Sequence, residues 1–302
     1  MSAYALREVI NVLINEVSKI TGLTKKAIEY YVERELLYPS ILENGYRDFS
    51  KAQVEQLQKI SILRKLGINT EEIKSLLSEK SKSYLQTLSV QKELNIQREQ
   101  AKKSILDKLA SGKEYSEISV ELQMVENSKT ITEKLLDAFP GYYGRFICLH
   151  FARFLNEPIT TDSQQSAYKK IISFLDNTPP LKLPEDLQEY LIEGTKNIGT
   201  VQIKEIIENT EKSIENPDDF LSNNKEILKQ YLIYKQSEEY KNSPAHKIIS
   251  LIKDFNNVSG YNDVFIPALR ELSSSYDDYY KQLKKANDKL LNEYPDIENL
   301  ID

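Results

Sequence analysis

The chain has 302 residues, enough for about two domains. Its 40 basic and 46 acidic side chains give a net charge of −6 at pH 7, which argues against a protein that binds nucleic acid over its whole surface. The charge is uneven, because residues 1–112 hold 18 basic and 14 acidic side chains whereas residues 113–302 hold 22 and 32. This asymmetry predicts one part that meets a polyanion and a second, acidic part that does not.

The remaining composition narrows the class of protein further. A single cysteine, Cys148, excludes an intramolecular disulfide framework and is typical of a reducing cytoplasm. No run approaches the roughly 18 apolar residues of a membrane span, and the N-terminus lacks the pattern of a signal peptide. Two histidines, His150 and His246, argue against a His-based metal site or catalytic dyad. We therefore expect a cytoplasmic protein with no membrane segment, metal or cofactor.

The first patterned stretch of the chain predicts a helix-turn-helix. One helical face is marked by Ile14, Val17 and Ile20. Thr21-Gly22 ends that pattern, and Thr24 is a suitable N-cap for a second helix over residues 25–34. Two short helices around a tight turn with glycine form this motif, whose second helix meets DNA with its N-terminal residues. The residues expected nearest the groove are Thr24, Lys25 and Lys26.

A hairpin and two further helices are expected next. Asn44-Gly45 is the strongest short hairpin signal, and a hairpin after a helix-turn-helix is a wing. Arg47 would lie on the returning strand, within reach of a DNA phosphate. Ser50 is a suitable N-cap for a helix that ends at Leu66-Gly67, and Thr70 is expected to cap a short helix after it.

Several short segments of this region fit one known pattern in order and spacing. They are Ile14-Asn15-Glu16-Val17, Thr21-Gly22-Leu23-Thr24, Tyr30-Tyr31, Leu36-Leu37, Pro39, Asn44-Gly45-Tyr46-Arg47, Phe49-Ser50, Leu63-Arg64-Lys65-Leu66-Gly67 and Glu71-Glu72-Ile73. Together they resemble the MerR family of bacterial transcription regulators, over about a quarter of the chain. The resemblance implies a winged helix-turn-helix DNA-binding domain over residues 10–78.

Five more residues are expected to contact the DNA backbone or to pack beneath it. They are Tyr30, Tyr31, Tyr46, Arg47 and Arg64. Adjacent helical side chains point about 100° apart, so at least one of Tyr30 and Tyr31 is expected in the core.

Two positions depart from the family pattern. Glu29 stands where the family usually has arginine, which removes an expected phosphate or base contact. We expect Glu29 to face solvent or to pair with Lys25 or Lys26; the alternative is that it accepts a hydrogen bond from cytosine N4. Glu35 stands where the family usually has glycine, at a cost of about 1 kcal/mol if the backbone there is left-handed.

Residues 81–111 contain no proline or glycine and predict one long helix. Its imperfect apolar seam consists of Leu85, Leu88, Leu94, Ala101, Ile105 and Leu109. In the MerR family this position holds an antiparallel coiled coil that joins two subunits, so the resemblance implies a homodimer. The alternative is that the helix packs on its own C-terminal domain.

Residues 113–302 are expected to form an all-helical regulatory domain. Nine of the ten prolines lie here and divide it into segments of helical length. Apolar spacing predicts helices over Ile131–Phe139, Tyr142–Asn156, Ser163–Asn177, Glu185–Glu193, Val201–Glu215, Lys225–Tyr240, Ala245–Asn256 and Ser274–Glu293. The region resembles no effector domain known to us. The predicted fold is therefore mainly α, with one small β-wing.

Aromatic residues near the start of this domain are candidates for a ligand pocket, since aromatic cavities with a few acids suit lipophilic or cationic ligands. The candidates are Tyr142, Tyr143, Phe146 and Glu157. The alternative, which we favour, is that this aromatic stripe at helical spacing is core. Cys148 and His150 would point to different faces of a helix, so a buried thiol is expected there rather than a metal site.

The sequence offers little support for catalysis. It contains no P-loop, no G-x-G-x-x-G and no G-x-S-x-G motif, and its paired acids lie in charge-rich helical segments. We therefore expect no enzyme. The third class of function, a helical enzyme with a regulator head, would need a polar cleft of perturbed carboxylates.

The combined prediction is a homodimeric transcription regulator of the MerR type in the bacterial cytoplasm, associated with the nucleoid. By resemblance, its partners are double-stranded promoter DNA and RNA polymerase holoenzyme, and it bends and untwists the promoter. A small-molecule effector in the C-terminal domain would bias the dimer between two shapes. The alternative is a phage, plasmid or chromosome-organising factor whose C-terminal domain is a protein-interaction or oligomerisation module.

Overall fold

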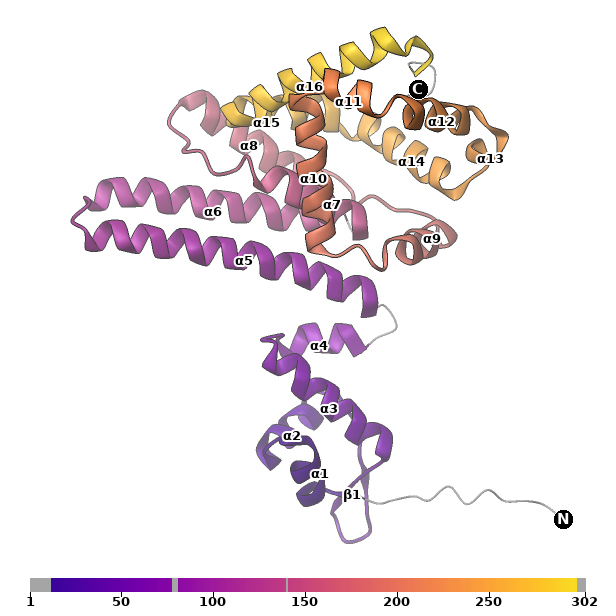
Figure 1. Ribbon diagram of the computed structural model, residues 1–302. Coiled ribbons are helices and arrows are strands. Elements are labelled where there is room, and N and C mark those ends of the chain that lie inside the picture. Colours follow the sequence, from indigo (N-terminus) through magenta and orange to yellow (C-terminus); the bar gives the residue numbers. More distant parts are fainter. Residues whose placement is uncertain (1–11, 78–80, 140, 298–302) are drawn as a thin grey trace, which may run out of the picture. The chain divides into compact units, whose positions relative to one another are not determined.

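The computed structural model describes residues 12–77, 81–139 and 141–297 (Figure 1). The chain divides into two compact units, residues 1–82 and residues 83–302, called here the head and the helical unit. Among the helices in the described ranges, none is long and apolar enough to cross a membrane.

The described part of the head combines short helices with one small sheet. Its elements are β1 (Val12–Leu13), α1 (Ile14–Thr21), α2 (Lys25–Glu33), β2 (Ser40–Ile41), β3 (Arg47–Phe49), α3 (Lys51–Lys65) and α4 (Thr70–Leu77). The strands are antiparallel in the order β1-β3-β2, with Val12 opposite Phe49 and Ser40 opposite Asp48. The predicted wing, β2 and β3, is confirmed, whereas the pairing of β1 with β3 was not predicted. The fully buried core residues of the described head include Val17, Ile28, Leu37, Phe49, Leu57, Ile60 and Ile73.

Local sequence signals set the ends of the first three helices. α1 ends at Gly22, whose φ of +69° is left-handed and suits glycine. Thr24 caps α2 as expected, because its Oγ1 accepts a hydrogen bond from the Ala27 N–H at 3.1 Å. Ser50 and Gln53 cap α3 reciprocally, each side chain accepting from the other's backbone N–H.

The cap of α4 differs from the expected one. Asn69 Oδ1 accepts from the Glu72 N–H at 2.9 Å, and the Glu72 carboxylate accepts from the Asn69 N–H at 2.6 Å. Because this reciprocal cap lies one residue earlier, Thr70 is the first residue of the helix and not its cap.

Glu35 is the only non-glycine residue with a left-handed backbone in the described ranges, at φ +59°. It follows α2, where the Leu36 N–H donates to the Tyr31 carbonyl and the Glu35 N–H donates to the Val32 carbonyl, both at 3.0 Å. This pair of hydrogen bonds is the Schellman motif, in which glycine is the preferred residue. The left-handed conformation that glycine would favour is therefore kept here by a glutamate.

The helical unit begins with two long antiparallel helices, α5 (Ser81–Ala110) and α6 (Tyr115–Ala138), joined by a turn at Gly112 with φ +94° (Figure 1). Ion pairs between the two helices are Arg98–Glu133 at 3.5 Å, Lys102–Glu126 at 3.8 Å and Lys108–Glu121 at 2.7 Å. Of α6, only residues 131–138 fall within a predicted helix. The first half of α6 is rich in polar residues and has only Ile118 buried, so apolar spacing did not reveal it.

The rest of the helical unit follows in short helical segments. They are α7 (Gly141–Ala152), α8 (Asp162–Asn177), α9 (Glu185–Thr195), α10 (Thr200–Glu215), α11 (Pro217–Asn223), α12 (Lys225–Gln236), α13 (Glu238–Lys241), α14 (Pro244–Ser259), the π-helical turn η1 (Tyr261–Phe265), α15 (Ile266–Leu272), α16 (Ser274–Glu293) and the 3-10 turn η2 (Pro295–Ile297). The all-helical prediction is confirmed. Three details were wrong or missing: the helix predicted over 225–240 is broken at Ser237, and α11 and α15 were not predicted.

One continuous apolar core joins α5, α6, α7, α8 and α15. Its fully buried members include Val90, Ile131, Phe139, Cys148, Ile171, Phe265 and Leu269. Gly144 of α7 lies directly against the end of α6, since a Cβ added there would come within 1.2 Å of the Phe139 carbonyl oxygen. Only glycine allows the α6–α7 corner to close this tightly.

Candidate nucleic-acid interface

Helix α2 presents a polar face to solvent and an apolar face to the head. Lys25, Lys26 and Glu29 are exposed, whereas Ile28 is fully buried. Thr24 precedes them at the N-terminal end, where unpaired backbone N–H groups favour an anion. The three residues expected nearest a DNA groove therefore lie together on one accessible surface.

The two adjacent tyrosines of α2 take different places. Tyr31 is 6% exposed and belongs to the core, while Tyr30 is 39% exposed. A hydrogen bond with the Thr70 side chain lowers the pKa of the Tyr30 hydroxyl, and the Arg34 guanidinium lies 5.3 Å from the centre of its ring. The structure thus confirms that one of the pair is core, and leaves Tyr30 as the one that faces outward.

The wing exposes two of the predicted contact residues. Tyr46 lies in the turn of the hairpin and is exposed, and its N–H donates to Asn44 Oδ1 at 3.1 Å. Gly45 supplies the left-handed residue of this turn, with φ +79°. Arg47, the first residue of β3, is half-exposed. Arg64 of α3 is also exposed, but its guanidinium already donates to the Ile68 carbonyl at 2.9 Å.

Glu29 has a partner that the sequence did not indicate. Its carboxylate lies 4.0 Å from the Arg47 guanidinium, and the two side chains are 49% and 37% exposed. Glu29 is exposed to solvent, as one of the two expectations had it, whereas the other fails, because no ion pair joins Glu29 to Lys25 or Lys26 in the described head. The contact depends on the wing folding back beside α2, and spacing along one helix could not reveal it.

The apolar seam predicted for α5 is mostly directed into its own unit. Leu88, Leu94 and Ile105 are buried, whereas Leu85 is exposed. Ala101 and Leu109 are half-buried. A second set of large apolar side chains remains on the outside of the α5–α6 pair, and consists of Ile96, Leu106, Tyr115, Val120 and Leu122.

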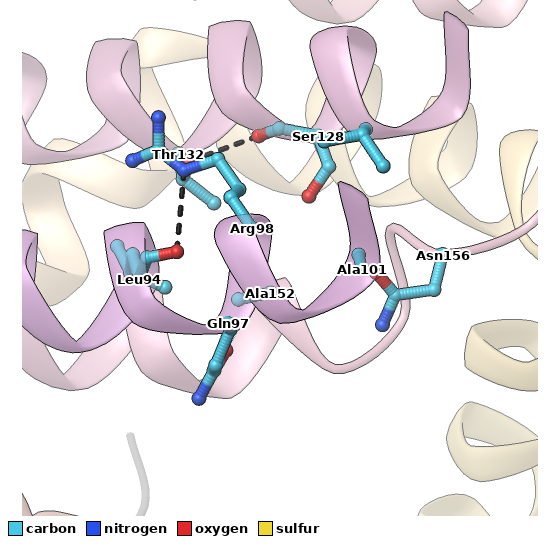
Figure 2. Close-up of a pocket in the computed structure, with 9 residues that line it drawn as sticks. Leu94, Gln97, Arg98, Ala101, Ser128, Thr132, Ala152 and Asn156 are labelled. Atoms are coloured by element: carbon cyan, nitrogen blue, oxygen red, sulfur yellow. Dashed lines mark hydrogen bonds between the residues drawn. The ribbon is translucent and has the colours of Figure 1, made fainter. Parts of the chain in front are cut away.

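A polar cavity lies where α5, α6 and the end of α7 meet (Figure 2). It has a volume of about 330 Å³ and is lined by Leu94, Gln97, Arg98, Ala101, Val125, Ser128, Thr132, Ala152 and Asn156. A second cavity of about 300 Å³ adjoins it, shares Gln97, Ala152 and Asn156, and extends to Arg153, Lys204 and Glu208. Each volume is at the lower end of the range for small-molecule sites.

Polar groups from α5, α6 and the loop after α7 converge on this cavity. Arg98 is largely buried and donates from Nε to the Leu94 carbonyl at 3.3 Å. Within the described residues, the side chains of Ser128 and Asn156 make no hydrogen bond with protein, and both line the cavity. Sequence reasoning missed these residues. Gln97-Arg98 interrupts the α5 seam, and that interruption is the one signal that could have pointed to a polar site.

The residues predicted for a ligand pocket lie elsewhere in the helical unit. Tyr142, Tyr143 and Phe146 are partly buried and pack against the apolar core. Glu157 holds the start of α16: its carboxylate accepts from the backbone N–H groups of Ser274 and Ser275 at 2.9 and 2.8 Å. Burial opposes ionisation of Glu157, but hydrogen bonds from Ser275, Ser274 and Ser273 outweigh it and lower its pKa to about 2.

Cys148 and His150 are both enclosed in α7. Burial raises the pKa of the Cys148 thiol to about 12, which leaves it protonated and unreactive at neutral pH. His150 lies among the rings of Phe146, Phe151, Phe154 and Tyr279. Burial, assisted by the Arg153 charge, lowers its pKa to about 4. No cluster of three or more His, Cys, Asp and Glu side chains suited to a metal ion occurs in residues 12–77, 81–139 and 141–297.

Comparison with known proteins gives matches for the head. Residues 13–80 match the family model "MerR HTH family regulatory protein". The chain is 38% identical over 66 residues to the HTH-type transcriptional regulator CueR of Yersinia pestis, covering 22% of this chain and 48% of that protein. It is 41% identical over 66 residues to CueR of Escherichia coli O157:H7, covering 22% and 49%.

A longer match is to the HTH-type transcriptional regulator TnrA of Bacillus subtilis (strain 168), 39% identical over 80 residues. It covers 26% of this chain and 71% of that protein. The chain spans about half the length of the CueR proteins that it matches. No solved structure matches the chain. On the family model and the extent of the TnrA match, the chain belongs to the MerR family of helix-turn-helix regulatory proteins.

Proposed function

We propose that the protein is a transcription regulator that binds promoter DNA as a homodimer, distorts it for RNA polymerase, and is controlled by a ligand in the helical unit. It would act on the nucleoid in the cytoplasm of a bacterium. The observation that carries the proposal is the exposed face of α2, where Thr24, Lys25 and Lys26 lie together beside a wing that exposes Tyr46 and Arg47.

The chemistry of this surface suits a DNA duplex. Lysine and arginine contacts with phosphate fix the position of a protein on DNA, and residues near the start of a recognition helix reach base edges. The modest positive charge of residues 1–112 is doubled in a dimer, while the acidic residues 113–302 stay off the polyanion.

The exposed apolar set of the α5–α6 pair supports dimerisation. Leu106 and Tyr115 are 63% and 77% exposed near the turn at Gly112. Exposed large apolar side chains can mark an interaction site, and a second copy of the chain would cover them symmetrically. A symmetric dimer would place its two recognition helices on the half-sites of a pseudo-palindrome.

The cavity of Figure 2 supports ligand control. It is lined by α5, the helix that follows the head along the chain, and it offers Arg98, Ser128 and Asn156 as hydrogen-bonding groups. A ligand held there would bind more tightly to one packing of α5 on α6 and α7 than to another. That difference in affinity is what control of DNA distortion requires.

DNA binding is tested by selecting binding sequences from random duplex DNA with the full chain and titrating the selected site with salt. We expect a pseudo-palindrome and an affinity that falls steeply with salt, as release of counterions from phosphate requires. Binding without sequence preference, or a flat salt dependence, would contradict the proposal.

Ligand control is tested with a substitution that fills the cavity. A metabolite panel would be screened by thermal shift on the wild-type chain and on Ala101→Phe, with Ala110→Phe as control because Ala110 lies near the end of the same helix and does not line the cavity. We expect compounds that stabilise wild type and Ala110→Phe but not Ala101→Phe. Compounds that stabilise all three proteins equally would place any ligand outside this cavity.

One feature favours the second candidate function, a protein-interaction module. Helix α12 has no buried residue, and Ile227, Tyr231 and Tyr234 are exposed at helical spacing along it. If this row is an oligomer contact, the double substitution Ile227→Ser and Tyr231→Ser will lower the mass of the oligomer that light scattering measures for the full chain. An unchanged mass would leave the ligand-controlled regulator as the better account.

A further inference from the structure

The N-terminal half of α2, which the proposed function directs at DNA, contains one group of the wrong charge for a polyanion, Glu29. Glu29 follows Lys25 by four residues and therefore lies on the same face of α2, one turn further from its N-terminus. Its carboxylate is exposed and not neutralised within α2. A carboxylate directed at phosphate would weaken binding by repulsion, so its presence on this face needs a compensating contact.

The only ion pair in the described head that links α2 to β3 is the one between Glu29 and Arg47. At 4.0 Å and half-exposed on both sides, this pair is long and well solvated, and such pairs are weak. A DNA phosphate would bind the Arg47 guanidinium more strongly than this carboxylate does. Binding of DNA to the wing would therefore release Glu29 toward the groove.

A carboxylate in the major groove can only accept hydrogen bonds, and this restricts the base that it tolerates. Cytosine offers the N4 amino group as a donor. Guanine offers N7 and O6, thymine offers O4, and these acceptors repel a carboxylate. Adenine places its acceptor N7 beside its donor N6, so a carboxylate meets one attraction and one repulsion there.

We propose that Glu29 is a specificity-determining residue that accepts a hydrogen bond from N4 of one cytosine in each half-site, while Arg47 shields it in the free protein. This inference rests on the proposed function, because it requires that α2 enters a major groove. On binding of DNA, the two side chains would separate: Glu29 would accept from a cytosine, and Arg47 would bind a phosphate.

The test uses the full chain as wild type, Glu29→Ala and Glu29→Gln, with Glu33→Gln as the matched control. Glu33 is an exposed glutamate one turn further along α2, so this control makes the same change of charge away from the N-terminal half of the helix. Preferred sequences are selected from random duplexes, and dissociation constants are then measured on sites that differ only at the selected cytosine.

We expect wild type and Glu33→Gln to select a cytosine in each half-site and to lose about 5- to 150-fold in affinity when that base pair is exchanged. Glu29→Ala should bind all four base pairs at that position within about twofold, and Glu29→Gln should shift its preference toward adenine, the base that glutamine reads. Circular dichroism and melting of each variant confirm that the exposed substitution leaves the head folded.

Two results would overturn the inference. One is an unchanged cytosine preference in Glu29→Ala. The other is a gain in affinity of Glu29→Ala that is equal for all sequences, since the carboxylate would then act only by repelling phosphate. A wild-type chain that selects no sequence at all would overturn the proposed function itself, and this outcome is distinct from both.

Discussion

The two units of the protein use charge in opposite ways. In the head, Lys25, Lys26 and Arg47 lie at the surface. Arg47 has one carboxylate near it, that of Glu29 at 4.0 Å. In the helical unit, Arg145 is 1% exposed and donates to the Ile198 carbonyl at 3.2 Å. The Glu157 carboxylate accepts a hydrogen bond from the Ser274 N–H at the start of α16. These three cations of the head are accessible to solvent, whereas Arg145 and Glu157 of the helical unit bind backbone groups of their own unit.

The sharpest test of this contrast is a change that should disrupt only the helical unit. Gly144→Ala forces a Cβ against the Phe139 carbonyl, and we expect it to lower the free energy of unfolding of that unit by about 3 kcal/mol or more. Hydrogen exchange should rise in peptides of α6 and α7 and stay unchanged in peptides of the head.

A matched glycine provides the control for that test. Gly194 lies within α9, and an added Cβ would meet nothing within 4 Å. Gly194→Ala should therefore leave the unit as stable or raise its stability by about 0.5–1 kcal/mol. Equal protection from hydrogen exchange in Gly144→Ala and Gly194→Ala would show that the α6–α7 corner can relax around a side chain.

The second test uses pH. The pKa of His150 is about 4 in the folded protein, below the ordinary histidine value of 6.5, so the unfolded chain binds the extra proton first as pH falls. The contribution of neutral His150 to the free energy of unfolding is complete above pH 6.5. It is lost as pH falls toward 4, by about 3 kcal/mol over the whole window. Urea unfolding monitored in the helical unit at pH 7 and pH 5 measures this loss.

Replacement of the imidazole separates His150 from other acidic effects. His150→Phe keeps an aromatic ring and removes the titration, so it should flatten the stability of the helical unit between about pH 6.5 and 4.5. Glu157 acts in a different range: because its folded pKa is about 2, its contribution is present above the usual glutamate pKa of 4.5 and is lost as pH falls toward 2. The same slope in His150→Phe and wild type would exclude His150 as the cause.

The third test addresses the head. Replacing Lys25 and Lys26 together by alanine should weaken binding to the selected DNA by about 10- to 100-fold and reduce its salt dependence. Lys182→Ala with Lys212→Ala makes the same change of charge in the helical unit and should leave affinity nearly unchanged. Equal losses in the two double variants would mean that net charge alone, and not the face of α2, drives binding.

The smallest expected effect concerns the backbone at the end of α2. Glu35→Gly should raise the free energy of unfolding of the head by about 1 kcal/mol, because glycine adopts the left-handed conformation without the strain of a Cβ. Glu33→Gly, two residues earlier within the helix, should instead lower stability by about 0.5–1 kcal/mol. Denaturant unfolding of wild type, Glu35→Gly and Glu33→Gly measures whether the free energy of unfolding rises in the first variant and falls in the second.

The head could be predicted largely because its signals are local. Thr24, Ser50 and Asn44-Gly45 each specify a cap or a turn within a few residues, and the structure places all three as expected. The features that were missed join distant parts of the chain. β1 pairs with β3 although α1, α2 and β2 lie between them in sequence, and Glu29 meets Arg47 only after the wing has folded beside α2.

The helical unit could be predicted as a class but not in its arrangement. Its prolines mark segment ends, yet α11 and α15 are short and were not detected by apolar spacing. The first half of α6 has one buried residue, Ile118, and forms ion pairs with α5 that no single-helix pattern contains. For the same reason the cavity was missed, because Arg98, Ser128 and Asn156 come from three separate segments.

The central position of β3 in the three-stranded sheet has a practical consequence. Its residues pair on one side with β2 and on the other with Val12 and Leu13, so the strand that carries Arg47 is held from both edges. A tag fused directly before residue 12 would adjoin β1, which pairs with this strand. Affinity tags or fluorescent labels for DNA-binding assays therefore belong on the helical unit, where they leave the position of the wing undisturbed.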